Sequence, residues 1–593
     1  MVNLRELLDA LPLDDSFLRK VPIPGVQGRC LLEVDLARGL AEGSPASPIE
    51  AYRSRHTPTL ASLVDGLRQA ADDARVLGLF VHCAGGAPLA RVAELRRAVR
   101  AFSAAGKPTL AWAESFGELA GGTGGYLLAT ACDEVWLQPS GELVLRGVVA
   151  QGIYARGALD KLGVLPQTSQ RKEYKSGFDT FTREDMSEAE REMLTALVAS
   201  VNAAAVEDIA TARDLEPQAV RAYLDEGLLP AQQALEQGLV DHLGYRDEAL
   251  AALRRRARDD KESAELRYVD RYRSSLPGLQ TVSKRGKPVV AVVQAIGPIH
   301  LGRSGSRPFE GRSVGSDTIG AVLRQAGRDK HVKAVVLRVD SPGGSYVASD
   351  AIRREVLNLR EEGTPVVASM GVVAASGGYF IAMPCQAIVA NAQTLTGSIG
   401  VLAGKQVVSD GLRKIGIQME GVAQGEHDEM FSSRRPFTDE EWERLNSWLD
   451  QVYEDFTRKA SRDRLMLWED LEPLARGRVW TGADAAQRGL VDEVGGMEEA
   501  IARACAAAEL DRSDVDVRIL PKVGPLDMLM PAESSEATSA AVPAGPERLI
   551  TELGGALGLG VPGLAESSLL GAALRAFATH SQGVLTMPDI RVD

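Results

Sequence analysis

The sequence predicts an α/β protein built from two tandem repeats, each with a parallel β-sheet, plus helical segments and a C-terminal extension. Three observations predict this class. The length of 593 residues exceeds what one hydrophobic core supports. A set of sequence blocks recurs once along the chain, and apolar strands alternate with amphipathic helices within each copy. The predicted domains are an N-terminal repeat at 1–285, a C-terminal repeat at 286–522, and a linker with a tail at 523–593.

The internal repeat can be read from paired blocks whose separation stays between 251 and 258 residues. So small a drift indicates a tandem duplication with a few loop insertions. The pairs are LRQAADDARVLGLFVHCAGG with LRQAGRDKHVKAVVLRVDSPGG, KPTLAWAES with TPVVASMGV, GGTGGYLLA with AASGGYFIA, and EQGLVDHLG with QRGLVDEVG.

Each copy is predicted to begin with an apolar strand, at 30–36 and again at 289–296. An amphipathic helix, a strand ending in glycines and a strand-to-helix turn follow, as in a parallel-sheet unit. Helices dominate the later part of each copy, for example over 186–212, where Ser187 and Glu190 have the spacing of a capping box.

Two stretches are predicted to lie outside the repeats. The charged segment 254–286 is the best candidate for a boundary between the copies. After the second copy, 531–547 has the composition of a flexible linker. The apolar but glycine-broken segment 549–577 is either an interfacial or partner-docking segment or a loosely packed tail.

Composition and charge exclude several classes of function. A formal charge of −14 and a pI near 5.3 disfavour nucleic acid as a partner, because phosphate binding needs clustered cationic surface. The five cysteines are scattered, so neither a disulfide framework nor a zinc site is predicted. The amino terminus lacks the apolar core of a signal peptide, and no run of about 18 apolar residues is found. We therefore expect a chain that stays on the side of the membrane where it is made.

The second copy carries a serine at a glycine-flanked strand-to-helix turn, in the block AASGGYF. Ser376 stands where the first copy has Thr123, and each is followed by Gly-Gly-Tyr. A serine in such a turn is sterically exposed, and the following helix directs backbone N–H groups toward whatever binds there. Ser376 is therefore a candidate nucleophile. A small residue that permits close packing of strand and helix is the alternative.

A second glycine turn, DSPGGS at 340–345, follows an apolar strand. Glycines at the end of a strand let successive N–H groups face a ligand, as an oxyanion hole requires. The first copy keeps Gly85 and Gly86 but has HCA in place of DSP. Many Gly-Gly turns have no chemical role, so this turn gains meaning only together with Ser376.

A serine hydroxyl needs a base, and none of the seven histidines lies in a block that would bring it near Ser376. His427 follows the turn, but it lies in the acidic stretch GEHDEM. A lysine serves instead where burial keeps its amine neutral. The first copy offers Lys175 in the block EYKSG, and the repeat puts Asp428 at the equivalent position of the second copy.

Five blocks, AASGGYF, TLTGSIGV, DSPGGS, EYKSG and RVWTGADAAQRGLVDEVG, together resemble the signal peptide peptidase A family of serine proteases in its long tandem-repeat form. The resemblance covers roughly 30–515. It implies that both repeats are Clp/crotonase-like, and that a Ser-Lys dyad takes its nucleophile, Ser376, from the second copy and its general base, Lys175, from the first.

The same resemblance assigns four further residues. It implies that Gly343 and Gly344 supply the N–H groups of the oxyanion hole, together with the amide of Gly377. It also implies that Ser398, in the block TGSIG, hydrogen-bonds the lysine and orients it. The implied reaction needs no metal or other cofactor.

The resemblance implies a substrate class and an assembly as well. Family substrates are cleaved signal peptides and other unfolded apolar segments, and family members form rings or domes, so we expect a homo-oligomer, most simply a tetramer. Long members usually begin with a membrane-spanning helix, which we do not find in this sequence. The expected location is therefore cytoplasmic or peripheral to the inner membrane.

Two other hypotheses stay open at this point. A crotonase-like acyl-CoA enzyme would use paired backbone amides at a thioester oxyanion, although such enzymes generally rely on carboxylates near the glycine turn. A non-catalytic scaffold would follow from decay of both copies, although random decay would not be expected to spare one element of the dyad in each. The sequence also leaves open whether Lys175 reaches Ser376 within one chain or across a subunit boundary.

Overall fold

The computed structural model describes residues 28–43, 45, 48–118, 120–259, 264–272, 286–307, 311–521, 585–586 and 591–592. The chain divides into two compact units. The first unit comprises 1–41, 56–146 and 206–286, and the second comprises 42–55, 147–205 and 287–593. The segment 147–205, which comes from the first copy of the repeat, therefore belongs to the unit that holds the second copy. The predicted linker at 531–547 and the apolar segment at 549–577 lie outside the described residues.

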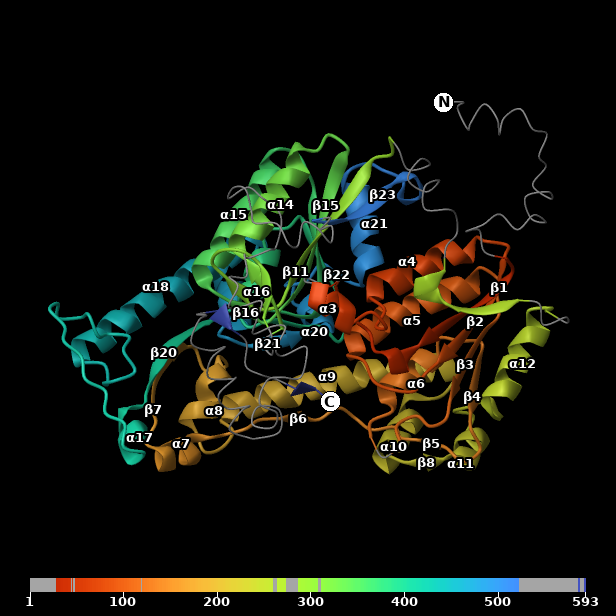
Figure 1. Ribbon diagram of the computed structural model, residues 1–593, viewed down its shortest axis with the longest axis horizontal. Coiled ribbons are helices and arrows are strands. Elements are labelled where there is room, and N and C mark those ends of the chain that lie inside the picture. The colour runs from red at the N-terminus through yellow and green to blue at the C-terminus, as the bar shows by residue number, and fades with distance from the viewer. Residues whose placement is uncertain are drawn as a thin grey trace. The chain divides into compact units, whose positions relative to one another are not determined.

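The first unit is built on a six-stranded parallel sheet (Figure 1). Its strand order is β10 (Glu265–Tyr268), β1 (Cys30–Asp35), β2 (Val76–His82), β3 (Thr109–Ala113), β4 (Glu134–Leu137) and β9 (His242–Leu243). Helices α4 (Leu60–Ala71), α5 (Leu89–Ala104), α6 (Thr123–Ala129) and α12 (Arg246–Arg256) accompany it. The strand predicted at 30–36 is confirmed as β1. Strand β10 lies inside the stretch that was predicted to be a boundary.

The second unit contains the larger sheet, with the order β21 (Val479–Thr481), β19 (Leu395–Gly397), β17 (Val366–Ala375), β15 (Val332–Ser341), β11 (Val289–Ile296) and β23 (Asp516–Leu520). Strands β18 (Ala387–Ala390) and β22 (Glu493–Val494) extend it from β17. Every pair is parallel except β19 with β21. The predicted α/β class with two parallel sheets is therefore confirmed.

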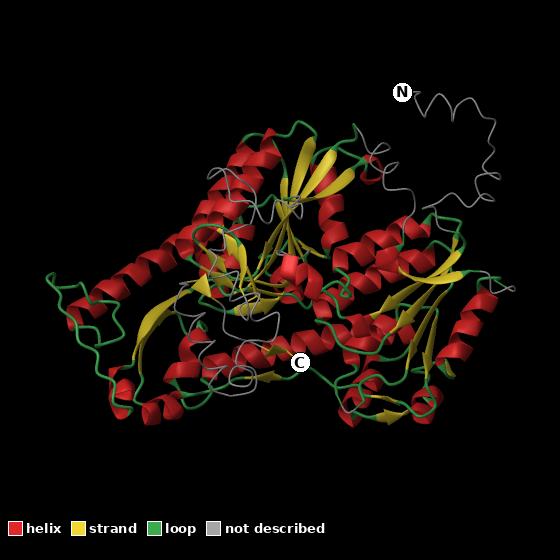
Figure 2. Cartoon of the chain, viewed as in Figure 1, coloured by secondary structure: helices red, strands yellow, loops and turns green. Residues whose placement is uncertain are grey.

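The strands of this sheet form because their sequences are apolar on both faces, as buried parallel strands require. In β11, Val289, Ala291 and Val293 pack on one face, against α14 (Ser316–Arg328), α15 (Tyr346–Glu361) and α16 (Gly377–Ala382). The alternate residues Val290 and Val292 pack on the other face, against α21 (Met497–Ala507). Figure 2 shows the strands of this unit flanked by helices on two sides.

Two smaller strand groups belong to the second unit. Strand β7 (Leu165–Arg171) pairs antiparallel with β20 (Val401–Val407), which joins the segment 147–205 to the second copy. A further sheet has the order β13 (Gly305–Arg307), β14 (Gly311–Gly315), β12 (Ile299–His300), β16 (Gly343–Gly344) and β24 (Leu585–Thr586). The glycine turn at 340–345 is thus a strand edge rather than a free loop.

Helix α9 (Glu188–Arg213) fulfils the prediction of a capped helix over 186–212, because the Ser187 hydroxyl accepts the Glu190 N–H at 3.2 Å. Met193, Leu194 and Leu197 of this helix pack against Ala375 and Val479. Within the described part of the chain, α9 is also the one helix long and apolar enough to cross a membrane by length and composition, with 44% of its most apolar stretch buried. Such a stretch is equally typical of a core helix.

Candidate active site

Ser376 lies at the turn between β17 and α16, where its backbone conformation is unusual. Its φ of 56° and ψ of −114° place a non-glycine residue in a rarely populated region, which costs on the order of 1–3 kcal/mol. The backbone is held by two hydrogen bonds, from Ser376 N–H to the Gly397 carbonyl at 2.8 Å and from Phe380 N–H to the Ser376 carbonyl at 2.9 Å. The side chain is buried. A turn that keeps this strain is typical of a serine presented for chemistry.

Lys175 lies beyond the end of β7, immediately before the short 3₁₀ helix η2 (Ser176–Phe178). Its Nζ is 2.8 Å from Ser376 Oγ, 2.9 Å from Ser398 Oγ and 2.9 Å from the Ser398 carbonyl oxygen. The side chain is fully buried, at 0% exposure. The structure therefore brings together the two residues predicted to form a dyad, and it does so within one chain.

The surroundings of Lys175 favour the neutral amine. Burial lowers the pKa of Lys175 well below its ordinary value, because the charged form loses its hydration. Among the described ion pairs, none offers this amine a carboxylate within 4.0 Å. A neutral amine has two N–H donors and one lone pair, which match two acceptors on Ser398 and one hydroxyl donor on Ser376. The arrangement can thus accept a proton from the Ser376 hydroxyl.

Ser398 is held in a fixed position beside the lysine. Its φ of 50° is again unusual for a non-glycine residue, and its N–H donates to the Arg478 carbonyl at 2.7 Å. The carbonyl and the hydroxyl of Ser398 consequently both face Lys175 Nζ. The contact predicted for Ser398 is observed.

A residue that the sequence analysis did not identify is Gly477, which precedes the RVWTG block. Its φ is +82°, and a Cβ on it would lie 2.5 Å from both the Cβ and the amide nitrogen of Lys175. Only glycine lets the chain pass so close to the lysine backbone. Beside it, Tyr174 N–H donates to the Arg476 carbonyl at 3.2 Å. The position of Gly477 directly before the RVWTG block could have drawn attention to it. The spacing of residues along the sequence, however, could not reveal which part of the backbone it approaches.

Gly343 and Gly344 form β16 and lie next to Gly377, the residue that follows Ser376. The Gly344 nitrogen is 3.1 Å, and the Gly343 Cα 3.2 Å, from the point that a Cβ on Gly377 would occupy. The Gly343 N–H donates to Ser341 Oγ at 3.2 Å. All three predicted glycines therefore gather beside Ser376, with the Gly343 amide engaged by a neighbouring hydroxyl.

The position equivalent to Ser376 in the first copy and the position equivalent to Lys175 in the second copy lack this arrangement. In the first unit, Thr123 is the first residue of α6, and its hydroxyl donates to the Arg146 carbonyl at 2.7 Å. In the second unit, Asp428 accepts the N–H groups of Gln424 and Gly425 at 3.2 and 2.7 Å. The counterparts of Ser376 and Lys175 thus both fix local backbone.

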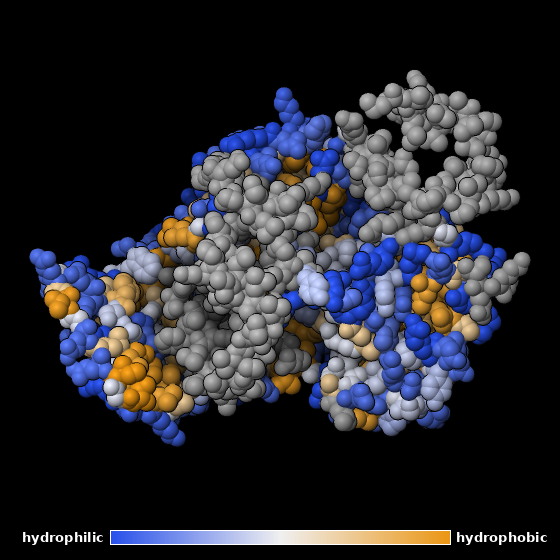
Figure 3. Space-filling model, in the orientation of Figure 1, coloured by the Kyte–Doolittle hydropathy of each residue, from blue (hydrophilic) through white to orange (hydrophobic). Residues whose placement is uncertain are grey.

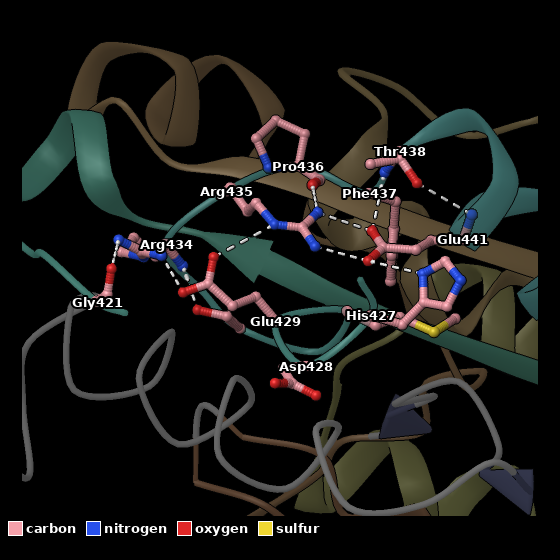
Figure 4. A network of polar contacts seen from close by, with 12 residues as sticks. Gly421, His427, Asp428, Glu429, Arg434, Arg435, Pro436, Phe437, Thr438 and Glu441 are labelled. Carbon is pink, nitrogen blue, oxygen red and sulfur yellow. Dashed lines mark hydrogen bonds and ion pairs between the residues drawn. The ribbon is translucent and has the colours of Figure 1, made fainter. Parts of the chain in front are cut away.

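Asp428 lies beside a network of polar contacts at the start of α18 (Asp439–Asp463) (Figure 4). Two hydrogen bonds from Arg435, at 2.7 and 2.6 Å, hold the pKa of the Glu441 carboxyl down at about 2. His427 lies 3.7 Å from the same carboxylate. The histidine that follows the turn in sequence therefore belongs to this network.

No group of three or more His, Cys, Asp or Glu side chains in the described ranges is arranged to hold a metal ion. All five cysteines are free, and four of them are buried. The buried site around Ser376 instead consists of a hydroxyl, an amine and backbone amides.

The chain matches the model of the family described as Peptidase family S49 over 101–259 and 358–511. Each matched segment falls in one copy of the repeat. The serine protease SPPA, chloroplastic, of Arabidopsis thaliana is 33% identical over 459 residues, which cover 76% of this chain and 66% of that protein. Protease 4 of Salmonella typhi is 33% identical over 469 residues, which cover 77% of this chain and 73% of that protein.

Solved structures give a weaker likeness. A mutant of the 1510-N membrane-bound stomatin-specific protease matches with a TM-score of 0.25 and 15% identity, covering 40% of this chain and 99% of that one. A ClpP1 mutant from Listeria monocytogenes matches with a TM-score of 0.23 and 12% identity, covering 37% of this chain and 97% of that one. The assignment to a family rests on the sequence relatives, whose matches extend over both copies of the repeat. The chain belongs to peptidase family S49 in its tandem two-domain form, and it is a serine protease of that family.

Proposed function

We propose that this serine protease hydrolyses peptide bonds in extended apolar polypeptides, remnant signal peptides among them, with Ser376 as nucleophile and Lys175 as general base. The observation that carries the proposal is the 2.8 Å contact between Lys175 Nζ and Ser376 Oγ, made by a fully buried amine. A buried neutral lysine is a recognised way to activate a serine hydroxyl.

In the first half of the reaction, the Lys175 lone pair takes the Ser376 proton as Oγ attacks the carbonyl carbon of the peptide. The tetrahedral oxyanion receives hydrogen bonds from the amides of Gly344 and Gly377, and from Gly343 once its bond to Ser341 is released. Collapse of the intermediate breaks the C–N bond, and the Lys175 ammonium returns the proton to the leaving amine.

In the second half, the acyl group stays esterified to Ser376 until water attacks it. Neutral Lys175 takes a proton from that water as the water oxygen attacks the ester carbon. The second tetrahedral intermediate then collapses to a carboxylic acid by breaking the C–Oγ bond, and the Lys175 ammonium returns the proton to Ser376 Oγ. Ser398 keeps the lysine in place through both halves, because its carbonyl and hydroxyl contact the amine independently of Ser376.

The test uses an internally quenched, leucine-rich peptide as substrate and an acyl-CoA thioester as the alternative. We expect peptide cleavage that falls by at least about 100-fold in Ser376→Ala and in Lys175→Ala, as loss of nucleophile or general base requires. Ser447→Ala, on the exposed face of α18, serves as the control and keeps full activity.

Two outcomes would contradict the proposal. One is peptide cleavage that persists in Ser376→Ala, and the other is turnover of the thioester in place of the peptide. Because the dyad contact lies within one chain, a mixture of the Ser376→Ala and Lys175→Ala proteins is expected to stay inactive.

The expected tetramer and the expected contact with the inner membrane stay predictions. An exposed apolar surface suited to such contacts lies in the second unit, near α7 (Arg156–Leu162) and α17 (Ser409–Lys414) (Figure 3). Its members are Leu162, Leu165, Ile415 and Ile417, each at least 40% exposed.

A further inference from the structure

The residues that carry Lys175 are held by a turn that comes much later in the sequence, at 476–478. The Tyr174 N–H donates to the Arg476 carbonyl at 3.2 Å, and a Cβ on Gly477 would lie 2.5 Å from the Cβ of Lys175. The turn and the lysine belong to the same compact unit. The backbone around Lys175 therefore rests directly on this turn.

The same turn also holds the chain segment on the other side of the amine. The Ser398 N–H donates to the Arg478 carbonyl at 2.7 Å, and the Gly477 N–H donates to the Ile399 carbonyl at 2.8 Å. The three contacts of the buried amine, at 2.8 to 2.9 Å, depend on how these two segments are placed. A shift of the turn would consequently change those distances.

The turn needs support of its own, and Tyr453 of α18 supplies it. Arg476 has a φ of 53°, which a non-glycine residue rarely adopts. Its N–H donates to the Tyr453 hydroxyl oxygen at 3.3 Å, and the Tyr453 hydroxyl donates to Glu472 Oε1 at 3.1 Å. A tyrosine hydroxyl both donates and accepts, so it can make the two bonds at once.

Tyr453 is itself firmly placed. Its side chain is 7% exposed, and it belongs to the same hydrophobic core as Leu449, Val452 and Phe456 of its helix. Burial and the neighbouring Glu472 carboxylate raise the pKa of Tyr453 above its ordinary value. The hydroxyl therefore keeps its proton and remains a donor to Glu472.

Charged side chains surround this hydroxyl, but most of them are partly exposed. Glu472 lies 3.9 Å from Lys172 Nζ and 3.9 Å from Arg476 Nε. Arg476 Nε lies 3.2 Å from Glu173 Oε1, and Lys172 Nζ lies 5.5 Å from the centre of the Tyr453 ring. The side chains of Lys172, Glu173 and Arg476 are between 39% and 41% exposed. Ion pairs of such exposure fix a backbone weakly, so the buried hydroxyl is the stronger support.

We propose that Tyr453 is a positioning residue of the dyad, whose hydroxyl fixes the 476–478 turn and thereby keeps Lys175 Nζ within reach of Ser376 Oγ. This inference rests on the proposed role of Lys175 as general base. Among the described hydrogen bonds, those of the Tyr453 hydroxyl reach Arg476 and Glu472 and not the dyad, so Tyr453 acts through the turn. Loss of the hydroxyl therefore impairs proton transfer and leaves peptide binding unchanged.

The first test is Tyr453→Phe, which keeps the ring and removes the hydroxyl. We expect kcat for a quenched, leucine-rich peptide to fall about tenfold with KM unchanged, because a small displacement of a catalytic group is costly. The control is Tyr126→Phe in the first unit, which removes a bond from a buried tyrosine hydroxyl to the Leu239 carbonyl at 2.6 Å and keeps full activity. An unchanged kcat for Tyr453→Phe, or a loss that lies in KM alone, would overturn the inference.

Glu472 provides a second pair of variants, which leaves Tyr453 intact. A glutamine at this position still accepts the Tyr453 hydroxyl, whereas an alanine does not. We expect Glu472→Ala to lose kcat as Tyr453→Phe does, and Glu472→Gln to keep most of it. Equal losses in the two variants would show that the charge of Glu472 holds the turn, and the inference would be wrong.

The rate of fluorophosphonate labelling at Ser376 separates positioning from a general loss of stability. If the hydroxyl acts through Lys175, Tyr453→Phe slows labelling about tenfold in the wild type but has no further effect in Lys175→Ala. Equal slowing in both backgrounds would overturn the inference.

The same measurement distinguishes failure of the inference from failure of the proposed function. If labelling depends on Lys175 but not on Tyr453, the positioning role is wrong and the dyad stands. If labelling does not depend on Lys175, the proposed dyad fails and the inference fails with it.

Discussion

At the residue scale, burial alone lowers the pKa of Lys175 well below its ordinary value. The amine is fully enclosed, and its hydrogen-bond partners are two hydroxyls and a carbonyl. In the unfolded chain the same amine is hydrated and charged at neutral pH. Folding must therefore release a proton from it, which opposes stability at every pH below the ordinary lysine pKa. The proposed role of Lys175 as general base would therefore come at the expense of stability.

This cost can be measured with Lys175→Met, which keeps the length of the side chain but cannot ionise. The pKa of Lys175 is lowered on folding from 10.5, so the unfolded wild-type chain binds a proton that the folded chain rejects. As the pH falls from about 10.5 toward the lowered pKa, wild-type stability therefore declines relative to the variant. We expect the free energy of unfolding of Lys175→Met, minus that of the wild type, to grow over this range and then level off.

Urea unfolding between pH 7 and pH 10 checks this expectation, and peptide cleavage by the variant is expected to be lost. The control is Lys287→Met, whose side chain is 40% exposed. The same measurement on this variant shows how much of the difference comes from replacing a partly exposed lysine. A pH-independent difference for Lys175→Met would mean that the buried amine is charged.

At the element scale, a buried ion pair attaches the segment 42–55 to the sheet of the second unit. Arg338 of β15 is 1% exposed, and its Nε donates to Glu42 Oε1 at 2.6 Å. Its Nη1 donates to Ser369 Oγ of β17 at 2.8 Å. Two strands and a distant segment thus meet at one guanidinium. Removing the charge of one partner leaves the other charge buried, which is costlier than the net value of the pair.

Glu42→Gln tests this attachment. We expect it to lower the free energy of unfolding by about 3 kcal/mol, because the Arg338 charge keeps its burial but loses its carboxylate. Glu50→Gln is the matched control, since Glu50 in the same segment lies 3.8 Å from Arg312 and is 29% exposed. Chemical denaturation of both variants provides the measurement, and equal effects would show that the buried pair is no more important than the half-buried one.

At the scale of the whole molecule, the duplicated chain divides its chemistry between its copies. The second copy supplies Ser376 and Ser398, and the segment 147–205 of the first copy supplies Lys175. The counterparts Thr123 and Asp428 hold local backbone instead. Each copy thus holds one residue of the proposed dyad, so neither copy is expected to act alone.

Much of this organisation could be predicted from the sequence, because repeats, apolar strands and glycine turns are local patterns. The two copies at offsets of 251 to 258 residues, the strands at 30–36 and 289–296 and the strand-to-helix turn at Ser376 are of this kind. Lys175 could not be identified from a local pattern of this kind. One lysine among 67 basic residues is not distinctive, and the resemblance to a known family singled it out.

The features that could not be predicted from the sequence depend on contacts between distant segments. Gly477 approaches the backbone of Lys175, some 300 residues earlier, and nothing in a local pattern reveals that approach. The pairing of Leu585 and Thr586 with the glycines of β16 joins a segment predicted only as a tail to the centre of the site. The grouping of 147–205 with the second copy likewise follows from the pairing of β7 with β20.

The most direct test of the account is the rate at which a fluorophosphonate labels Ser376 as a function of pH, in the wild type and in Lys175→Ala. Below its lowered pKa the Lys175 amine is protonated and cannot accept the hydroxyl proton, so labelling should slow as the pH falls through that value. We expect an inflection well below 10.5 in the wild type and a rate at least about 100-fold lower, without that inflection, in the variant. Labelling that is equally fast without Lys175, or an inflection at the ordinary lysine value, would contradict it.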